Sequence, residues 1–209
     1  MIRRLRIRLV AVSMLSLFIV LTVIMGTMAV VSWQNLTDNA DFTLSILEDN
    51  GGVYVVPAFT GFGAPHWDMY ARGAIFGLTR GSNRSHIIRA SLESIAYQTK
   101  DVLDAMERDS GVAITAMRCD GGSAVNRFLM QFQADLLGLP VDVPKVRDTT
   151  AQGAAYMAAV GVDDYASLKD FEGFWQLERR YEPRMGQDQR QLLMERWHRA
   201  VDRCRGWEK

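Results

Sequence analysis

The residues with the clearest capacity for chemistry form a glycine turn, Asp120-Gly121-Gly122-Ser123, between a predicted strand and a predicted helix. Glycines let the backbone approach a ligand closely, and a helix N-terminus favours anionic groups. The turn is therefore a candidate nucleotide-binding site. A tight connection between a strand and a helix explains two glycines equally well, so the turn alone leaves both interpretations open.

Other polar side chains have no partner at a spacing that indicates catalysis. Structural or solvated roles are expected for three acidic residues, Asp68, Glu93 and Asp148. The three histidines form no pair typical of metal ligands, and we expect surface or capping roles for His66, His86 and His198. No residue is assigned as catalytic, and none as a metal ligand.

The elements that position the turn alternate between strands and helices. Runs rich in β-branched and aromatic residues predict strands at residues 53–56, 73–79, 114–119 and 141–143. Helices are predicted at residues 126–137 and 151–160, the second capped by Thr149 and Thr150, and a last amphipathic helix carries Leu193, Trp197, Val201 and Cys204 on one side. This alternation indicates an α/β fold.

A long helix is predicted between the second and third strands. Ser82 or Asn83 is a suitable N-cap, and Gly111 ends the helix. Its apolar residues fall on one stripe, formed by Ile88, Leu92, Ile95, Thr99, Val102 and Met106.

Composition excludes several classes of function. The 209 residues carry 24 basic and 24 acidic side chains, and this balance gives no electrostatic argument for nucleic-acid binding. The two cysteines, Cys119 and Cys204, lack a metal-ligand spacing and are expected to be reduced thiols.

The first fifty residues predict a membrane anchor. Four arginines, at positions 3, 4, 6 and 8, precede residues 9–33, which contain no charged side chain. About 25 residues of helix extend roughly 37 Å, enough to cross a bilayer. An uncleaved single-pass anchor is favoured over a signal peptide, whose apolar core would be shorter. With the acidic segment 34–50, this region resembles the membrane entry of a bacterial sensor histidine kinase.

Residues 52–207 closely resemble the C-terminal part of the glycerol kinases of the FGGY family of carbohydrate kinases. The residues that carry the resemblance lie at 52–68, 71–81, 86–99, 120–122, 128–133 and 149–156. The loop Ala64-Pro65-His66-Trp67-Asp68 is typical of glycerol kinases rather than of the pentose kinases in the same family.

The resemblance implies an actin-like ATPase (ribonuclease H-like) fold and phosphorylation of glycerol to glycerol 3-phosphate by ATP with Mg²⁺. It further implies that Gly122 and Asn126 contact ATP and that Gly121 and Ser123 line the same turn. In these kinases the catalytic aspartate and the glycerol-binding residues lie in a preceding domain, which has no counterpart in this sequence. We therefore expect the chain alone to be catalytically inactive, and the resemblance leaves open whether it forms a homo-oligomer.

The two predicted regions, residues 1–50 and 51–209, conflict in topology. Arginines before the span indicate a cytoplasmic N-terminus, which would place the following residues outside the cytoplasm, whereas the kinase family is cytoplasmic. This conflict indicates that the two regions were joined recently, by accident or through an error of assembly. The alternative function is a non-catalytic, membrane-anchored module, the product of a chimeric gene, that binds a nucleotide or a partner.

Overall fold

The computed structural model describes residues 47–209. The predicted membrane span at residues 9–33 lies outside the described residues, as does most of the predicted segment 34–50. Among residues 47–209, no helix is both long enough and apolar enough to cross a bilayer.

The described residues before Gly51 are joined to the α/β unit by hydrogen bonds. The Arg89 guanidinium donates to the carbonyl oxygen of Leu47, and the side-chain amide of Asn50 donates to Glu93 Oε2 at 2.7 Å. Asn50 is 6% exposed. These residues belong to the compact unit that extends to Lys209.

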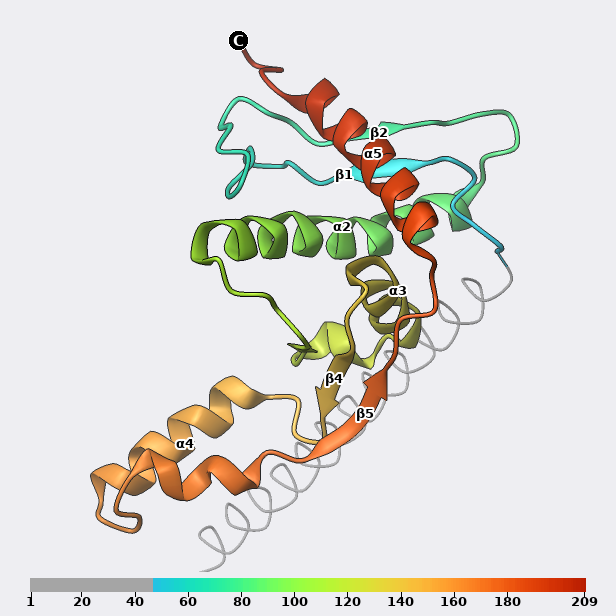
Figure 1. Ribbon diagram of the computed structural model, residues 1–209. Helices are drawn as coiled ribbons and strands as arrows, with labels where there is room; N and C mark the ends of the chain where they lie inside the picture. The colour runs from blue at the N-terminus through green and yellow to red at the C-terminus, as the bar shows by residue number, and fades with distance from the viewer. Residues whose placement is uncertain (1–46) are drawn as a thin grey trace, which may run out of the picture. The chain divides into compact units, whose positions relative to one another are not determined.

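The unit is a mixed α/β structure in which strands and helices alternate along the chain (Figure 1). Its strands are β1 (Tyr54–Val56), β2 (Ala74–Phe76), β3 (Met117–Arg118), β4 (Val141–Pro144) and β5 (Leu177–Tyr181). Its helices are α2 (Arg84–Ser110), α3 (Arg127–Leu137), α4 (Thr149–Gly161) and α5 (Gln187–Cys204), with short 3₁₀ helices η1 (Gly122–Val125) and η2 (Leu168–Phe174). The predicted α/β class is confirmed.

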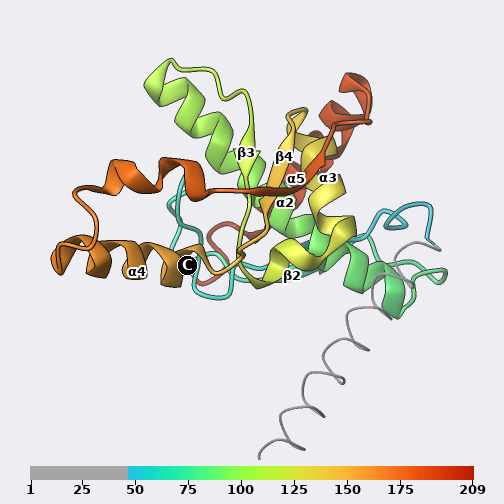
Figure 2. The same cartoon turned by 90° about the horizontal axis from the view of Figure 1, so that it is seen from below.

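The strands form two separate sheets. Strands β1 and β2 pair antiparallel, with Val55 opposite Ile75. In the second sheet β4 is central, parallel to β3 and antiparallel to β5. Figures 1 and 2 both show α4 and η2 extending away from the rest of the unit, beyond the second sheet.

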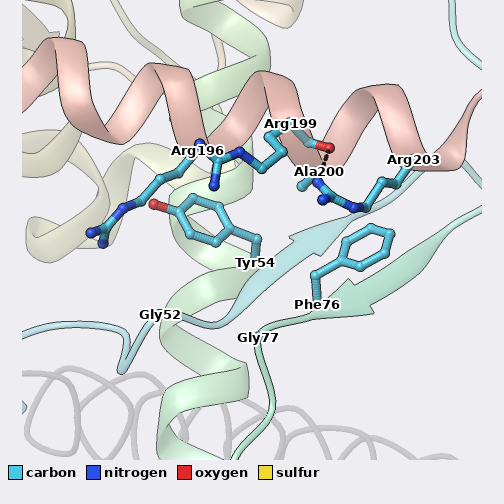
Figure 3. Close-up of a pocket in the computed structure, with 8 residues that line it drawn as sticks. All are labelled: Gly52, Tyr54, Phe76, Gly77, Arg196, Arg199, Ala200 and Arg203. Atoms are coloured by element: carbon cyan, nitrogen blue, oxygen red, sulfur yellow. Dashed lines mark hydrogen bonds between the residues drawn. The ribbon is translucent and has the colours of Figure 1, made fainter.

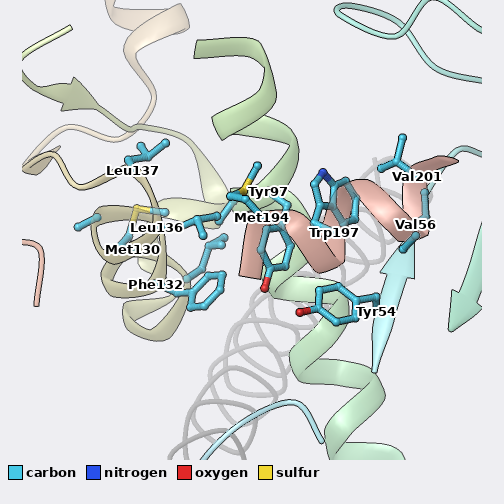
Figure 4. Close-up of a cluster of buried hydrophobic side chains, with 14 of the residues drawn as sticks. Tyr54, Val56, Tyr97, Met130, Phe132, Leu136, Leu137, Met194, Trp197 and Val201 are labelled. Carbon is cyan, nitrogen blue, oxygen red and sulfur yellow. The ribbon is translucent and has the colours of Figure 1, made fainter. Parts of the chain in front are cut away.

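Aromatic rings from four elements form the centre of the core (Figure 4). Tyr97 of α2 stacks on Trp197 of α5 with 5.1 Å between ring centroids, and it contacts the rings of Tyr54 and Phe132 at 5.7 Å each. Tyr97 and Trp197 are each 1% exposed. These contacts hold α2 and α5 against β1 and α3, so the predicted inward side of the last helix is confirmed at Trp197.

The predicted apolar stripe of α2 is not its buried face. Ile95, Val102 and Met106 are 40%, 37% and 55% exposed. The buried residues of this helix are Ala90, Glu93, Ser94, Ala96, Tyr97 and Asp101. The polar members of that face are buried because other elements satisfy them through hydrogen bonds, which helical periodicity does not reveal.

The ends of two helices agree with the sequence. The side chain of Asn83 caps α2 by accepting from the backbone N–H groups of Ser85 and His86. Gly111 and Gly138 end α2 and α3 in the left-handed conformation, at φ 68° and 70°, which glycine adopts without steric cost.

The N-cap prediction for α4 is wrong. Asp148, rather than Thr149 or Thr150, accepts the hydrogen bond from the backbone N–H of Ala151, at 3.1 Å. Aspartate at this position suits the helix dipole as well as the unpaired N–H groups.

Two predicted strands are shorter than expected, and two elements were not predicted. Pairing covers only 74–76 of the predicted 73–79, and only 117–118 of the predicted 114–119. The missed elements are η2 and β5. Strand β5 has the sequence Leu-Glu-Arg-Arg-Tyr, and four of its five residues are exposed. Because neither of its faces is buried, the sequence lacks the alternation of apolar and polar residues by which a strand is predicted.

Candidate nucleotide site

The predicted glycine turn joins the second sheet to α3. Strand β3 ends at Arg118, and Gly121 adopts φ 80° and ψ −176°, which is open essentially to glycine alone. The Gly121 N–H donates to the carbonyl oxygen of Arg147 at 2.8 Å, and the Ala124 N–H donates to Gly121 at 3.2 Å. The turn is thereby fixed to the segment that precedes α4.

Open space lies beside both glycines. A Cβ atom placed on Gly121 or Gly122 meets no other atom within 4 Å. The N–H groups of Gly122 and Ser123 open the η1 helix, where the first N–H groups have no acceptor within the helix. The turn therefore offers backbone donors to a ligand without a side chain in the way.

The turn lines one side of a cavity of about 420 Å³. The other side is formed by Arg147, Asp148 and Thr150, at the start of α4. The cavity thus lies beside the starts of both η1 and α4, and helix starts attract anions. Asp120 and Asp148 add two carboxylates to its lining, so a metal-bound anion suits it better than a free one.

The structure brings together two of the four predicted site residues at this cavity, namely Gly121 and Gly122. Ser123 lies in η1 with an exposed side chain. Asn126 is the N-cap of α3, where its Oδ1 accepts from the Leu129 N–H at 2.8 Å. That bond occupies the amide oxygen and leaves the amide NH₂ available as a donor.

The sequence did not single out Arg147 or Thr150 as site residues. Their proximity to the turn depends on the parallel pairing of β3 with β4, beyond which Gly121 and Arg147 are hydrogen-bonded to each other. One guanidinium nitrogen of Arg147, Nη2, also donates to both carboxylate oxygens of Glu178 of β5, at 2.9 Å each. The one available signal was the position of both segments at the ends of neighbouring strands.

A buried carboxylate organises a second polar cluster, away from the turn. Asp101 of α2 is 6% exposed and accepts from Trp197 Nε1 at 2.7 Å. Its oxygens also lie 2.7 Å from His198 Nε2 and 3.2 Å from His66 Nε2. Surface or capping roles were expected for the histidines; His86 does cap α2, but His66 and His198 share Asp101.

The electrostatics of this cluster favour an ion pair. Burial alone would raise the pKa of Asp101, but its three hydrogen-bonding neighbours outweigh burial and lower that pKa. The hydrogen bond to Asp101 raises the pKa of His198. The cluster ties α2 and the 57–72 loop to α5, so it has a structural function.

The acidic residues at the other predicted positions are also structural. Asp68 accepts from the backbone N–H of Gly206 at 2.8 Å, and Glu93 accepts from Arg89 Nε at 2.8 Å. Within residues 47–209, no three histidine, cysteine or acidic side chains cluster in a way that would hold a metal ion.

Comparison with known proteins gives a consistent result. Residues 28–162 match the family described as the FGGY family of carbohydrate kinases, C-terminal domain. A glycerol kinase of Caldanaerobacter subterraneus subsp. tengcongensis is 55% identical over 83% of this chain and 35% of its own length. Glycerol kinase 2 of Thermotoga maritima is 56% identical over 77% of this chain and 32% of its own length. The chain thus spans about a third of the length of these relatives.

Solved structures show the same fold. The crystal structure of Plasmodium falciparum glycerol kinase with ADP has a TM-score of 0.71 and 34% identity, over 83% of this chain and 36% of that one. A ligand-bound xylulose kinase of Lactobacillus acidophilus has a TM-score of 0.61 at 20% identity, over 80% of this chain and 33% of that one. The second likeness concerns the fold alone.

Proposed function

Because the chain belongs to the FGGY family of carbohydrate kinases, we propose that residues 47–209 form the nucleotide-binding part of a glycerol kinase. The intact enzyme would transfer the γ-phosphoryl group of ATP to glycerol. The observation that carries the proposal is the open glycine turn, which borders a cavity between the starts of η1 and α4. The similarity to a glycerol kinase crystallised with ADP supports it.

Each predicted residue has a separate task in this proposal. The backbone of Gly121 and Gly122 lies against the nucleotide, because neither residue has a side chain to obstruct it. Ser123 contributes its backbone N–H at the start of η1. Asn126 donates from its amide NH₂, since its amide oxygen already caps α3. In phosphoryl transfer such groups position the nucleotide rather than react with it.

Mg²⁺ belongs to the proposed function through the nucleotide. Mg²⁺ is usually held by one or two carboxylates together with substrate phosphates, and it neutralises phosphate charge when bound. Asp120 and Asp148 line the cavity, and their carboxylates would hold Mg²⁺ together with the phosphates of the nucleotide. The carboxylate of Asp148 also caps α4, which fixes its position.

A fluorescent ADP analogue tests the proposal on the full chain. We expect saturable binding with Mg²⁺, weakened by about tenfold or more in Gly122→Val, a loss of about 1.4 kcal/mol. The Cβ of that variant enters open space and leaves the fold unstrained. Gly173→Val is the matched control, because Gly173 also has free space and lies in η2. Equal affinities in the two variants, or no binding at all, would refute the proposal.

A membrane-anchored, non-catalytic module is the second candidate. The observation that favours it is the uncharged stretch at residues 9–33 that follows four arginines. Expression of the full chain and alkaline carbonate extraction of membranes tests it. Retention of the full chain in the membrane pellet, lost after deletion of residues 9–33, would support the anchor. Release of the full chain into the supernatant would exclude the anchor.

A further inference from the structure

A second cavity, of about 390 Å³, lies between α5 and the β1–β2 hairpin (Figure 3). It shares no lining residue with the cavity at the glycine turn. Figure 3 shows α5 passing over the rings of Tyr54 and Phe76, with three arginine side chains on the side of the helix that faces them. The cavity is within the size range of small-molecule sites.

The three arginines are Arg196, Arg199 and Arg203, spaced three and four residues apart on one face of α5. Like charges at these spacings repel and destabilise a helix. Within residues 47–209, none of the three forms an ion pair with a carboxylate. A chain with 24 acidic side chains therefore leaves this cluster of positive charge without a neutralising partner in its described part.

Tyr54 gives an independent indication of a ligand. Its side chain is 6% exposed, and its hydroxyl, which is shielded from solvent, makes no hydrogen bond of good geometry among the described residues, although the side chains of Tyr97 and Arg196 lie near it. A buried polar atom without a partner is costly and calls for an explanation. The hydroxyl oxygen is directed toward the side chain of Arg196 (Figure 3). Burial raises the pKa of Tyr54, so the hydroxyl keeps its proton and can donate to an anion.

A purely structural explanation accounts for only one arginine. Arg203 lies in the last turn of α5, where a cation favours the helix dipole, and it donates to the carbonyl oxygen of Arg199 at 3.0 Å. Neither reason applies to the side chains of Arg196 and Arg199, which are exposed and are hydrated when no ligand is bound.

We propose that this cavity binds a small phosphorylated molecule. Its phosphoryl oxygens contact the guanidinium groups of Arg196 and Arg199, because guanidinium groups match the oxygens of phosphate. They reach the buried hydroxyl of Tyr54 when the exposed Arg196 side chain turns toward the ligand and uncovers it. The uncharged part of the ligand lies against the rings of Tyr54 and Phe76. The cavity is too small for a macromolecular polyanion, and it is separate from the proposed nucleotide site.

Calorimetric titration of the full chain with inorganic pyrophosphate, at physiological ionic strength, tests the proposal. We expect saturable binding that weakens about tenfold or more in the double variant Arg196→Gln, Arg199→Gln. Tyr54→Phe removes only the hydroxyl and is expected to weaken binding severalfold with the fold intact. The charge-matched control replaces two exposed arginines elsewhere, as Arg108→Gln, Arg184→Gln, and is expected to bind like the parent chain.

The outcomes separate this site from the proposed nucleotide site. Pyrophosphate binding that persists in Gly122→Val supports the arginine cavity even if the nucleotide proposal fails. Binding that disappears in Gly122→Val but survives in the Arg196 and Arg199 variant overturns the inference. An equal loss in the charge-matched control also overturns it, because nonspecific attraction would then explain the binding.

Discussion

Asn126 has one amide group and two candidate tasks, which a single substitution separates. Asn126→Asp keeps the oxygen that caps α3 but replaces the NH₂ donor with negative charge. We expect the free energy of unfolding to stay within about 0.5 kcal/mol, because aspartate is an equally good N-cap. The affinity for the ADP analogue is expected to fall about tenfold. Unchanged affinity would mean that Asn126 serves only as a cap.

His198 provides a prediction about pH. Its raised pKa means that the pair with Asp101 stabilises the fold fully below the unfolded histidine pKa of about 6.5, and this contribution is lost as pH rises through the folded value. Asp101 has a lowered pKa, so its contribution is present above about pH 4 and is lost as pH falls through its folded value. The pair is therefore most stabilising at about pH 4–6.5.

His198→Gln is expected to lower the free energy of unfolding of the full chain by about 0.5–1 kcal/mol at pH 5.5, and by less at pH 8. The modest size reflects a side chain that is 50% exposed. Urea unfolding at the two pH values measures the difference. A larger loss at pH 8 would contradict the assigned charge state.

At the residue scale, the sequence predicts what depends on near neighbours. Asn83 and Gly111 were identified as caps because a cap is a local requirement of backbone geometry. The partners of Asp101 lie 35, 96 and 97 positions away, and no local pattern connects them. The glycine turn was therefore predictable from the sequence, whereas the polar cluster around Asp101 was not.

At the scale of elements, α2 is the part where the sequence pattern and the structure differ most. Its apolar stripe has the period of a buried helix face, yet Ile95, Val102 and Met106 are substantially exposed. The buried face carries Glu93. Burial raises the pKa of this carboxyl group, and Arg89 and Asn50 both donate hydrogen bonds to it. Periodicity located the helix correctly but not the side that packs.

The exposed stripe leads to a prediction about stability. Val102→Ser is expected to change the free energy of unfolding by less than about 0.5 kcal/mol, because its side chain is already in contact with water. Leu129→Ala is expected to cost about 2–5 kcal/mol, because Leu129 is 1% exposed. Urea denaturation of the full-length variants gives both values. A cost for Val102→Ser near that of Leu129→Ala would mean that the stripe is packed in solution.

At the scale of the whole molecule, the chain spans about a third of the length of its relatives, and this decides what activity to expect. Phosphoryl transfer requires a positioned acceptor and a base for its hydroxyl, as well as bound nucleotide. We expect no ADP release that depends on both glycerol and Mg²⁺-ATP when the full chain is tested alone. Release at a rate comparable to that of an intact glycerol kinase would contradict this expectation.

Hydrogen–deuterium exchange of the full chain with and without Mg²⁺-ADP tests whether nucleotide binds at the glycine turn. We predict slower exchange on binding in two segments that are separate in sequence, residues 121–126 and 147–152, because residues of both segments line the same cavity. Exchange in α5 is expected to stay unchanged. Protection confined to other segments, or none at saturating nucleotide, would contradict the assignment of this cavity as the nucleotide site.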